Sequence, residues 1–138
     1  MKIIICADGS ECSDKAVRYA AQFAKNCGAD LTILHVIKDV ASHRELPTYP
    51  GFISEKERAE AIVSRAKEMV EKVNKDITCH EKIACGPISS EIARIAEVER
   101  FDGIIMGTKG TSGLRRLLIG SVAEDVIRHA HCTVTVVR

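Results

Sequence analysis

The chain has 138 residues, of which 46% are hydrophobic and 4% aromatic, and its formal net charge at pH 7 is +1. This length suits a single domain, residues 1–138, with an aliphatic core. Acidic and basic residues are interspersed, so we expect no nucleic-acid partner. No apolar run approaches the roughly 20 residues that span a bilayer. Because Met1 also leads into Ile3 without a signal-peptide pattern, we expect a cytoplasmic protein with no membrane partner.

Apolar residues follow two periodicities along the chain. Short continuous runs are typical of buried strands, and stripes with a spacing of three or four residues are typical of helices. Ser54 and Glu57 form a capping-box pattern at the start of the second helix. The expected strands are 2–7, 30–37, 76–85, 102–106 and 132–137, and the expected helices are 11–27, from Ser54 to Val73, from Pro87 to Ala96, and 121–130, with a loop at 38–53.

Five strands that alternate with four helices predict an α/β fold, a doubly wound parallel sheet with helices on both faces. If the strand order is 3-2-1-4-5, the order reverses between the first and fourth strands. Ligands of such sheets bind beyond the carboxyl ends of the strands at this reversal. The residues there are 7–10 (ADGS) and 107–110 (GTKG). The topology therefore predicts that an Asp-Gly-Ser turn lies beside a glycine-containing loop.

The stretch 106–121, MGTKGTSGLRRLLIGS, combines the end of a strand, a glycine loop and the start of a helix. Glycines such as Gly107 and Gly110 let backbone N–H groups approach an anion closely. Gly120 and Ser121 open a helix, whose first turn offers free N–H donors and the positive end of its dipole. This pattern indicates a phosphate or nucleotide site. The alternative is a surface loop whose glycines serve only the turn.

Three polar residues are candidates for contacts with such a ligand. Asp8, at the carboxyl end of the first strand, is suited to a magnesium or manganese ion beside phosphates, because these hard cations prefer oxygen ligands. Asp-Gly is also a common turn pair, so a purely structural role stays open. Ser121 is placed to donate its hydroxyl to a phosphate or to cap its helix. Lys109 is either a phosphate contact or a solvated loop residue.

Several other kinds of site are excluded by the motifs. The sequence has no GxxxxGK[ST] phosphate loop, no GxGxxG turn after the first strand and no HExxH zinc pair. The six cysteines include no C-x-x-C pair. We interpret most of them as small hydrophobic residues on apolar faces rather than as redox or metal groups.

The spacing Gly107-x2-Gly110-x9-Gly120-Ser121 resembles the G-x2-G-x9-G-[S/T] motif of the ATP-binding universal stress proteins. Four further stretches resemble family segments, so that the likeness covers essentially the whole chain: 3–10 (IIICADGS), 34–36 (LHV), 104–110 (IIMGTKG) and 119–124 (IGSVAE). The resemblance implies a five-stranded fold of the adenine-nucleotide α-hydrolase-like type. It also implies ATP, with magnesium or manganese, in the crevice between the first and fourth strands.

By position, the resemblance implies roles for individual residues. The base and ribose side carries over to Ala7, Asp8, Val36, Met106 and Gly107. The family's contacts with the triphosphate correspond here to Thr108, Lys109, Gly110, Gly120, Ser121 and Val122. Asp8 would help to place the metal or the ribose. The chain departs from the family at Ala7 and Ala123, where some members have a hydroxyl residue, and at Lys109, which is often His or Arg.

The leading hypothesis is therefore a cytoplasmic ATP-binding protein of stress response or signalling. One alternative is a slow metal-dependent ATPase, for which no convincing general base is evident. The other is a nucleotide-free protein-interaction module. The last strand, from Cys132 to Val137, is expected at an edge of the sheet, and exposed edge strands pair readily with other chains. The family resemblance likewise implies a homodimer through this strand.

Overall fold

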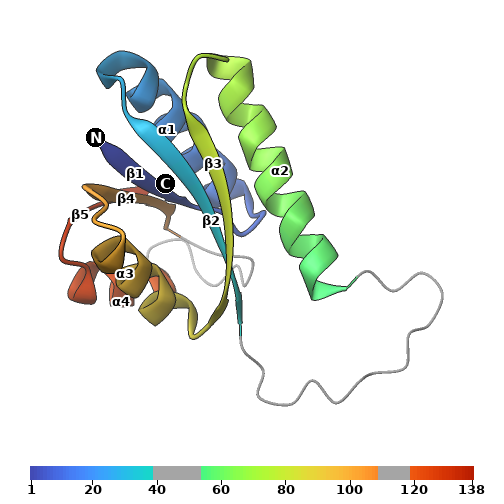
Figure 1. The fold of residues 1–138 in the computed structure, drawn as a ribbon. Coiled ribbons are helices and arrows are strands. Elements are labelled where there is room, and N and C mark those ends of the chain that lie inside the picture. The colour runs from blue at the N-terminus through green and yellow to red at the C-terminus, as the bar shows by residue number, and fades with distance from the viewer. Residues whose placement is uncertain (39–53, 109–118) are drawn as a thin grey trace.

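The computed structural model describes residues 1–38, 54–108 and 119–138 (Figure 1). Within these residues, five strands form one parallel sheet in the order β3-β2-β1-β4-β5, which confirms the predicted fold class. The strands are β1 (Lys2–Cys6), β2 (Asp30–Lys38), β3 (Cys79–Gly86), β4 (Gly103–Gly107) and β5 (Thr133–Val137). The helices are α1 (Glu11–Cys27), α2 (Glu55–Val73), α3 (Ile88–Val98) and α4 (Ser121–His129).

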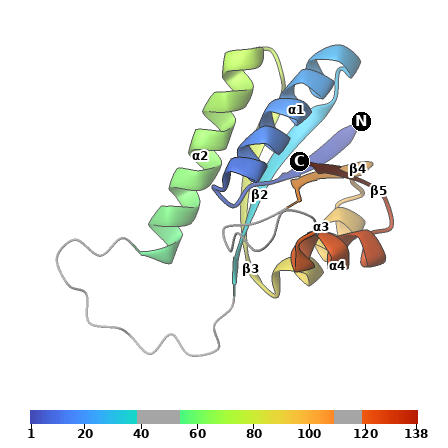
Figure 2. The same ribbon diagram turned by 180° about the vertical axis from the view of Figure 1, so that it is seen from behind.

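The helices cover the two faces of the sheet in pairs. Helices α1 and α2 pack on one face, and α3 and α4 pack on the other (Figures 1 and 2). Parallel neighbours require crossover connections, and here the crossovers place consecutive helices on the same face. The first and fourth strands are therefore neighbours, in the register Ile3↔Gly103 to Ile5↔Ile105. The carboxyl ends of β1 and β4 meet where the strand order reverses.

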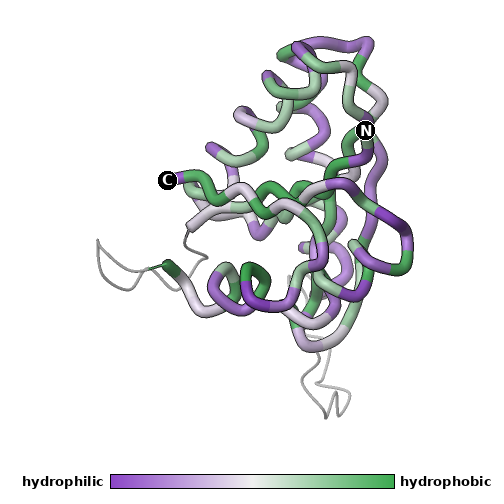
Figure 3. Tube along the Cα trace, turned by 90° about the vertical axis from the view of Figure 1, so that its left-hand side faces the viewer, coloured by the Kyte–Doolittle hydropathy of each residue, from purple (hydrophilic) through white to green (hydrophobic). Residues whose placement is uncertain are grey.

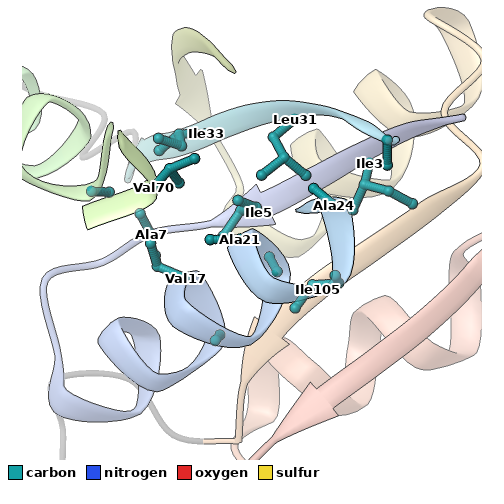
Figure 4. Close-up of a cluster of buried hydrophobic side chains, with 14 of the residues drawn as sticks. Ile3, Ile5, Ala7, Val17, Ala21, Ala24, Leu31, Ile33, Val70 and Ile105 are labelled. Carbon is teal, nitrogen blue, oxygen red and sulfur yellow. The ribbon is translucent and has the colours of Figure 1, made fainter. Parts of the chain in front are cut away.

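Each face of the sheet buries its own aliphatic core. In Figure 4, Ala21 and Ala24 of α1 lie against Ile5 and Ile3 of β1 in the core below α1 and α2. Phe101 is the one aromatic side chain among the buried hydrophobic residues of the described chain. Figure 3 shows the strands as mostly hydrophobic, whereas the helices alternate between the two colours. None of the described helices combines the length and apolarity needed to cross a membrane.

The strand boundaries differ from the sequence prediction at seven ends, by three residues at the start of β3 and by one residue at each of the others. Strand β3 begins at Cys79 rather than Asp76, because the backbone N–H of Asp76 donates to Oδ1 of Asn74 at 3.0 Å and closes a turn. Strand β2 continues to Lys38, where it pairs with the end of β3. Strand β4 includes Gly107, which the sequence placed in the following loop.

Candidate ligand-binding site at the carboxyl edge of the sheet

A cavity of about 540 Å³ lies at the carboxyl edge of the sheet. Its walls come from the ends of β1, β2 and β4 and from the first turns of all four helices. This volume falls within the range of small-molecule sites. The charged side chains that line it within the described chain are Asp8, Lys38, Glu55 and Arg58, so that acids and bases balance. The rest of the described wall is largely aliphatic.

Every predicted site residue that the structure describes lines this one cavity. These residues are Ala7, Asp8, Val36, Met106, Gly107, Thr108, Gly120, Ser121 and Val122. Lys109 and Gly110 lie outside the described residues. The fold thus brings together segments from both halves of the chain, as the strand order predicts. The binding role of each residue stays a prediction.

The turn after β1 is held by a set of local hydrogen bonds. The Oδ1 atom of Asp8 accepts from the backbone N–H of Ser10 at 2.9 Å, and the backbone N–H of Asp8 donates to Oγ of Ser13 at 3.2 Å. Ser10 in turn caps α1 by accepting from the N–H of Ser13. One carboxylate oxygen of Asp8 therefore serves the turn. No donor within the described chain bonds the other oxygen, which leaves it for a ligand.

His35 ties the ends of β1 and β2 together beside this turn. Its Nδ1 lies 2.7 Å from the carbonyl oxygen of Ala7. Because a carbonyl only accepts, Nδ1 is the donor. The N–H of Ala7 also donates to the carbonyl of Leu34 at 2.9 Å. These two bonds fix the position of the residue that precedes Asp8.

Gly107 has a packing role that spacing alone did not reveal. A Cβ atom at this position would lie 2.7 Å from the backbone carbon of Cys12 and 2.9 Å from its carbonyl oxygen. The start of α1 therefore approaches the end of β4 so closely that only a glycine fits. Gly107 holds the wall of the cavity in shape, whether or not it also contacts a ligand.

The first turn of α4 has the properties of an anion-binding site. Its N-cap residue Gly120 makes no side-chain capping bond. Within the described chain, no group accepts from the N–H groups of Ser121 and Val122, and both residues line the cavity. The backbone of Gly120, with φ −66° and ψ 153°, is open to any residue. Its conformation therefore does not require glycine, whereas the close approach of a ligand would.

The cysteines divide into packed and exposed groups. Burial raises the pKa of the Cys6 thiol to about 12, with a further contribution from the negative charge of Asp8, and burial raises that of Cys79 to about 11. These thiols stay protonated at neutral pH and behave as apolar groups, as the sequence predicted. Cys27 and Cys85 are exposed instead, and all six cysteines are free.

Sequence reasoning missed the contribution of α2 and α3 to the cavity. Helix α2 supplies Glu55, Arg58 and Ile62, and α3 supplies Ile88 and Ile92. The sequence shows that these residues are on helices, and Ile62, Ile88 and Ile92 also belong to the apolar stripes that pack against the sheet. No local pattern separates residues at the rim of the sheet from those in its core. Only the placement of each helix over the sheet does so.

A doubly wound sheet with a cavity at its strand-order reversal, bordered by the first turn of α4, places this chain among the α/β folds whose ligand sites lie at that position. The sequence model of the universal stress protein family matches residues 1–138. The chain belongs to the universal stress protein family.

Individual members of the family resemble the chain over nearly its full length. A universal stress protein of Methanocaldococcus jannaschii is 39% identical over 141 residues, which cover 99% of this chain and 81% of that protein. A universal stress protein solved in complex with cAMP has 21% identity and a TM-score of 0.78, covering 100% of this chain and 97% of that one. The Archaeoglobus fulgidus protein in complex with dAMP has 22% identity and a TM-score of 0.73, covering 100% and 98%. These two structures share the fold.

Proposed function

We propose that this chain binds an adenine nucleotide, with ATP as the principal ligand, in the cavity at the carboxyl edge of the sheet. The observation that carries the proposal is one cavity that combines an aliphatic wall with the first turn of α4, whose N–H groups have no acceptor among the described residues. An aliphatic wall suits a base, and free N–H groups at a helix start suit phosphates. Two universal stress proteins of the same fold hold cAMP and dAMP.

The proposed arrangement follows the geometry of the walls. The base and ribose lie near Val36, Met106 and Asp8, and the phosphates lie near Gly120 and Ser121. Within the described residues, no three His, Cys, Asp or Glu side chains gather to hold a metal on their own. A magnesium or manganese ion would therefore be bound by the free carboxylate oxygen of Asp8 together with phosphate oxygens, which is a common arrangement for magnesium.

The proposal extends to a cytoplasmic role in stress response or signalling. Membership of the universal stress protein family supports the stress role. The six free cysteines, two of them exposed, are in keeping with a reducing compartment.

Isothermal titration with Mg-ATP tests the proposal directly. The wild type is expected to bind, and Gly120→Val is expected to abolish binding because its side chain occupies the phosphate position. Valine tolerates the extended backbone at Gly120, so the fold is retained. Ala130→Val is the matched control, since it adds bulk at the other end of α4 in a similar conformation, φ −69° and ψ 136°. Undetectable wild-type binding at millimolar ATP would refute the proposal, and so would unchanged binding by Gly120→Val.

We also propose that the chain forms a homodimer through its edge strand, residues 132–137. Strand β5 pairs with β4 on one side, and no strand of the described chain pairs with its other side. Its central residues Val134, Thr135 and Val136 are only partly buried. An edge of this kind is a template for pairing with a second chain. Light scattering at micromolar concentration is expected to give the dimer mass, and a monomer mass would count against the proposal.

A further inference from the structure

Helix α2 is not part of the glycine motif, but one of its faces lines the cavity. Glu55, Arg58 and Ile62 recur on this face at helical spacing, and all three line the cavity. Ile62 packs this face against the turn after β1, since a Cβ atom added to Gly9 would lie 3.4 Å from Cγ1 of Ile62. Further along the helix, Arg65 forms an ion pair with Asp14 of α1. These contacts hold the start of α2 beside the turn that carries Asp8.

Arg58 is the cation on this face that has no ion-pair partner among the described residues. Arg65 pairs with Asp14, and Arg94 pairs with Glu91. Within residues 1–38, 54–108 and 119–138, no ion pair or side-chain hydrogen bond involves the guanidinium of Arg58. Glu55, one turn earlier, makes no ion pair within those residues either. The guanidinium is therefore exposed at the cavity wall without a structural contact that would occupy it.

The strand order places Arg58 at the end of the cavity away from the proposed phosphate position. Helix α2 packs over β2 and β3, whereas α4 follows β4. Strand β1 lies between β2 and β4, so these two strands are about 10 Å apart at the usual strand spacing, and α2 and α4 lie on opposite faces of the sheet beside them. This separation is about the length of a nucleoside. A nucleotide whose phosphates lie on α4 would thus extend its base toward Arg58.

Among the described residues, the base end of the cavity offers no other planar cation. No Phe, Tyr or Trp of the described chain lines the cavity, and its nearby walls are aliphatic at Val36, Ile62 and Ile92. The imidazole of His35 is planar, but it is held by its bond to Ala7. A guanidinium is planar and weakly hydrated, so it can stack flat on an aromatic face, whereas an ammonium meets a ring only as a point charge, as Lys2 does 4.6 Å from the centre of the Phe101 ring.

We propose that Arg58 is a specificity-determining residue that stacks its guanidinium on the base of the bound nucleotide. This inference rests on the proposed function, since it requires a nucleotide with its phosphates at α4. The guanidinium would cover one face of the base. It favours a purine, whose two fused rings offer a larger face than a pyrimidine.

The test compares the affinities of AMP, ADP and ATP for the wild type and three variants. Arg58→Ala is expected to weaken binding by about threefold to thirtyfold, the range for a cation on an aromatic face. The factor is expected to be the same for all three nucleotides, because the base is common to them. Arg58→Lys is expected to restore little, since it keeps the charge and loses the planar group. Lys56→Ala removes an exposed charge from the same helix turn, outside the cavity, and is the matched control.

The outcomes separate this inference from the proposed function. If the wild type binds and Arg58→Ala binds equally well, the role of Arg58 is refuted and the proposed function stands. A loss that grows with the number of phosphates would place Arg58 on the phosphates and overturn the stacking. If Arg58→Lys bound as tightly as the wild type, or if Lys56→Ala lost as much affinity as Arg58→Ala, positive charge alone would explain the loss. Either result would also overturn the stacking proposal. If the wild type binds none of the three nucleotides, both proposals fail.

Discussion

Replacement of Gly107 by alanine tests how tightly α1 is packed against the end of β4. The new Cβ would meet backbone atoms of Cys12 at 2.7 and 2.9 Å and its Cβ at 3.0 Å. Backbone atoms at the start of a helix cannot rotate away as the end of a side chain can. Either the first turn of α1 moves from β4 or β4 shifts in the sheet, and each movement disturbs buried contacts.

The expected loss of stability follows from this overlap. Overpacking of a well-packed interior by one methyl group costs about 1–3 kcal/mol. For a chain of 138 residues, the entropy of unfolding at the midpoint is about 0.29 kcal/mol/K. The melting temperature of Gly107→Ala is therefore expected to fall by about 3–10 °C.

Thermal and urea denaturation without nucleotide measure this effect separately from binding. Gly103→Ala, in the same strand, is the control. Its Cβ would meet Cδ1 of Ile3 at 3.1 Å and the carbonyl oxygen of Thr133 at 3.4 Å. The closer of these atoms is the end of a flexible side chain, so a smaller loss is expected. If Gly107→Ala were as stable as the wild type, or lost no more than Gly103→Ala, the packing argument would be refuted.

Two further predictions concern the start of α2 and the thiols. Ser54→Ala is expected to lower the free energy of unfolding by about 1 kcal/mol in urea melts at pH 7, because it removes the cap of α2. The hydrogen bonds to Ser54 lower the pKa of Glu57 from its usual 4.5. The Glu57 carboxylate therefore stabilises the fold above pH 4.5, and this contribution disappears as the pH falls through the lowered pKa. A stability difference between wild type and Ser54→Ala that grew on acidification would contradict this pH dependence. In the folded protein, a thiol reagent at pH 8 is expected to modify Cys27 and Cys85 rapidly and Cys6 only after unfolding, because burial raises the pKa of Cys6 to about 12. Mass spectrometry of the peptides identifies the modified cysteines. Rapid modification of Cys6 in the folded protein would contradict its burial.

The sequence by itself determined the fold class, because local signals agreed along the chain. Continuous apolar runs predicted buried parallel strands, and stripes at helical spacing predicted the helices that cover them. The Ser54–Glu57 pattern predicted a capping box that the structure contains. On the assumption of the strand order 3-2-1-4-5, Asp8 and Gly107 were predicted to lie side by side, and the structure shows this order and both residues in one cavity. Chain order and periodicity suffice where a feature depends on neighbours in sequence or on topology.

The tertiary structure alone decided which further residues reach that cavity. Arg58 carries no sequence signal that distinguishes it from the other exposed cations of α2, and its place at the cavity depends on how α2 crosses α1. The need for glycine at position 107 depends on the backbone of Cys12, which is remote in sequence. The bond from His35 to Ala7 likewise joins two strands. These features depend on distances between segments that come together only when the chain folds. Periodicity and residue spacing along the sequence therefore cannot predict them.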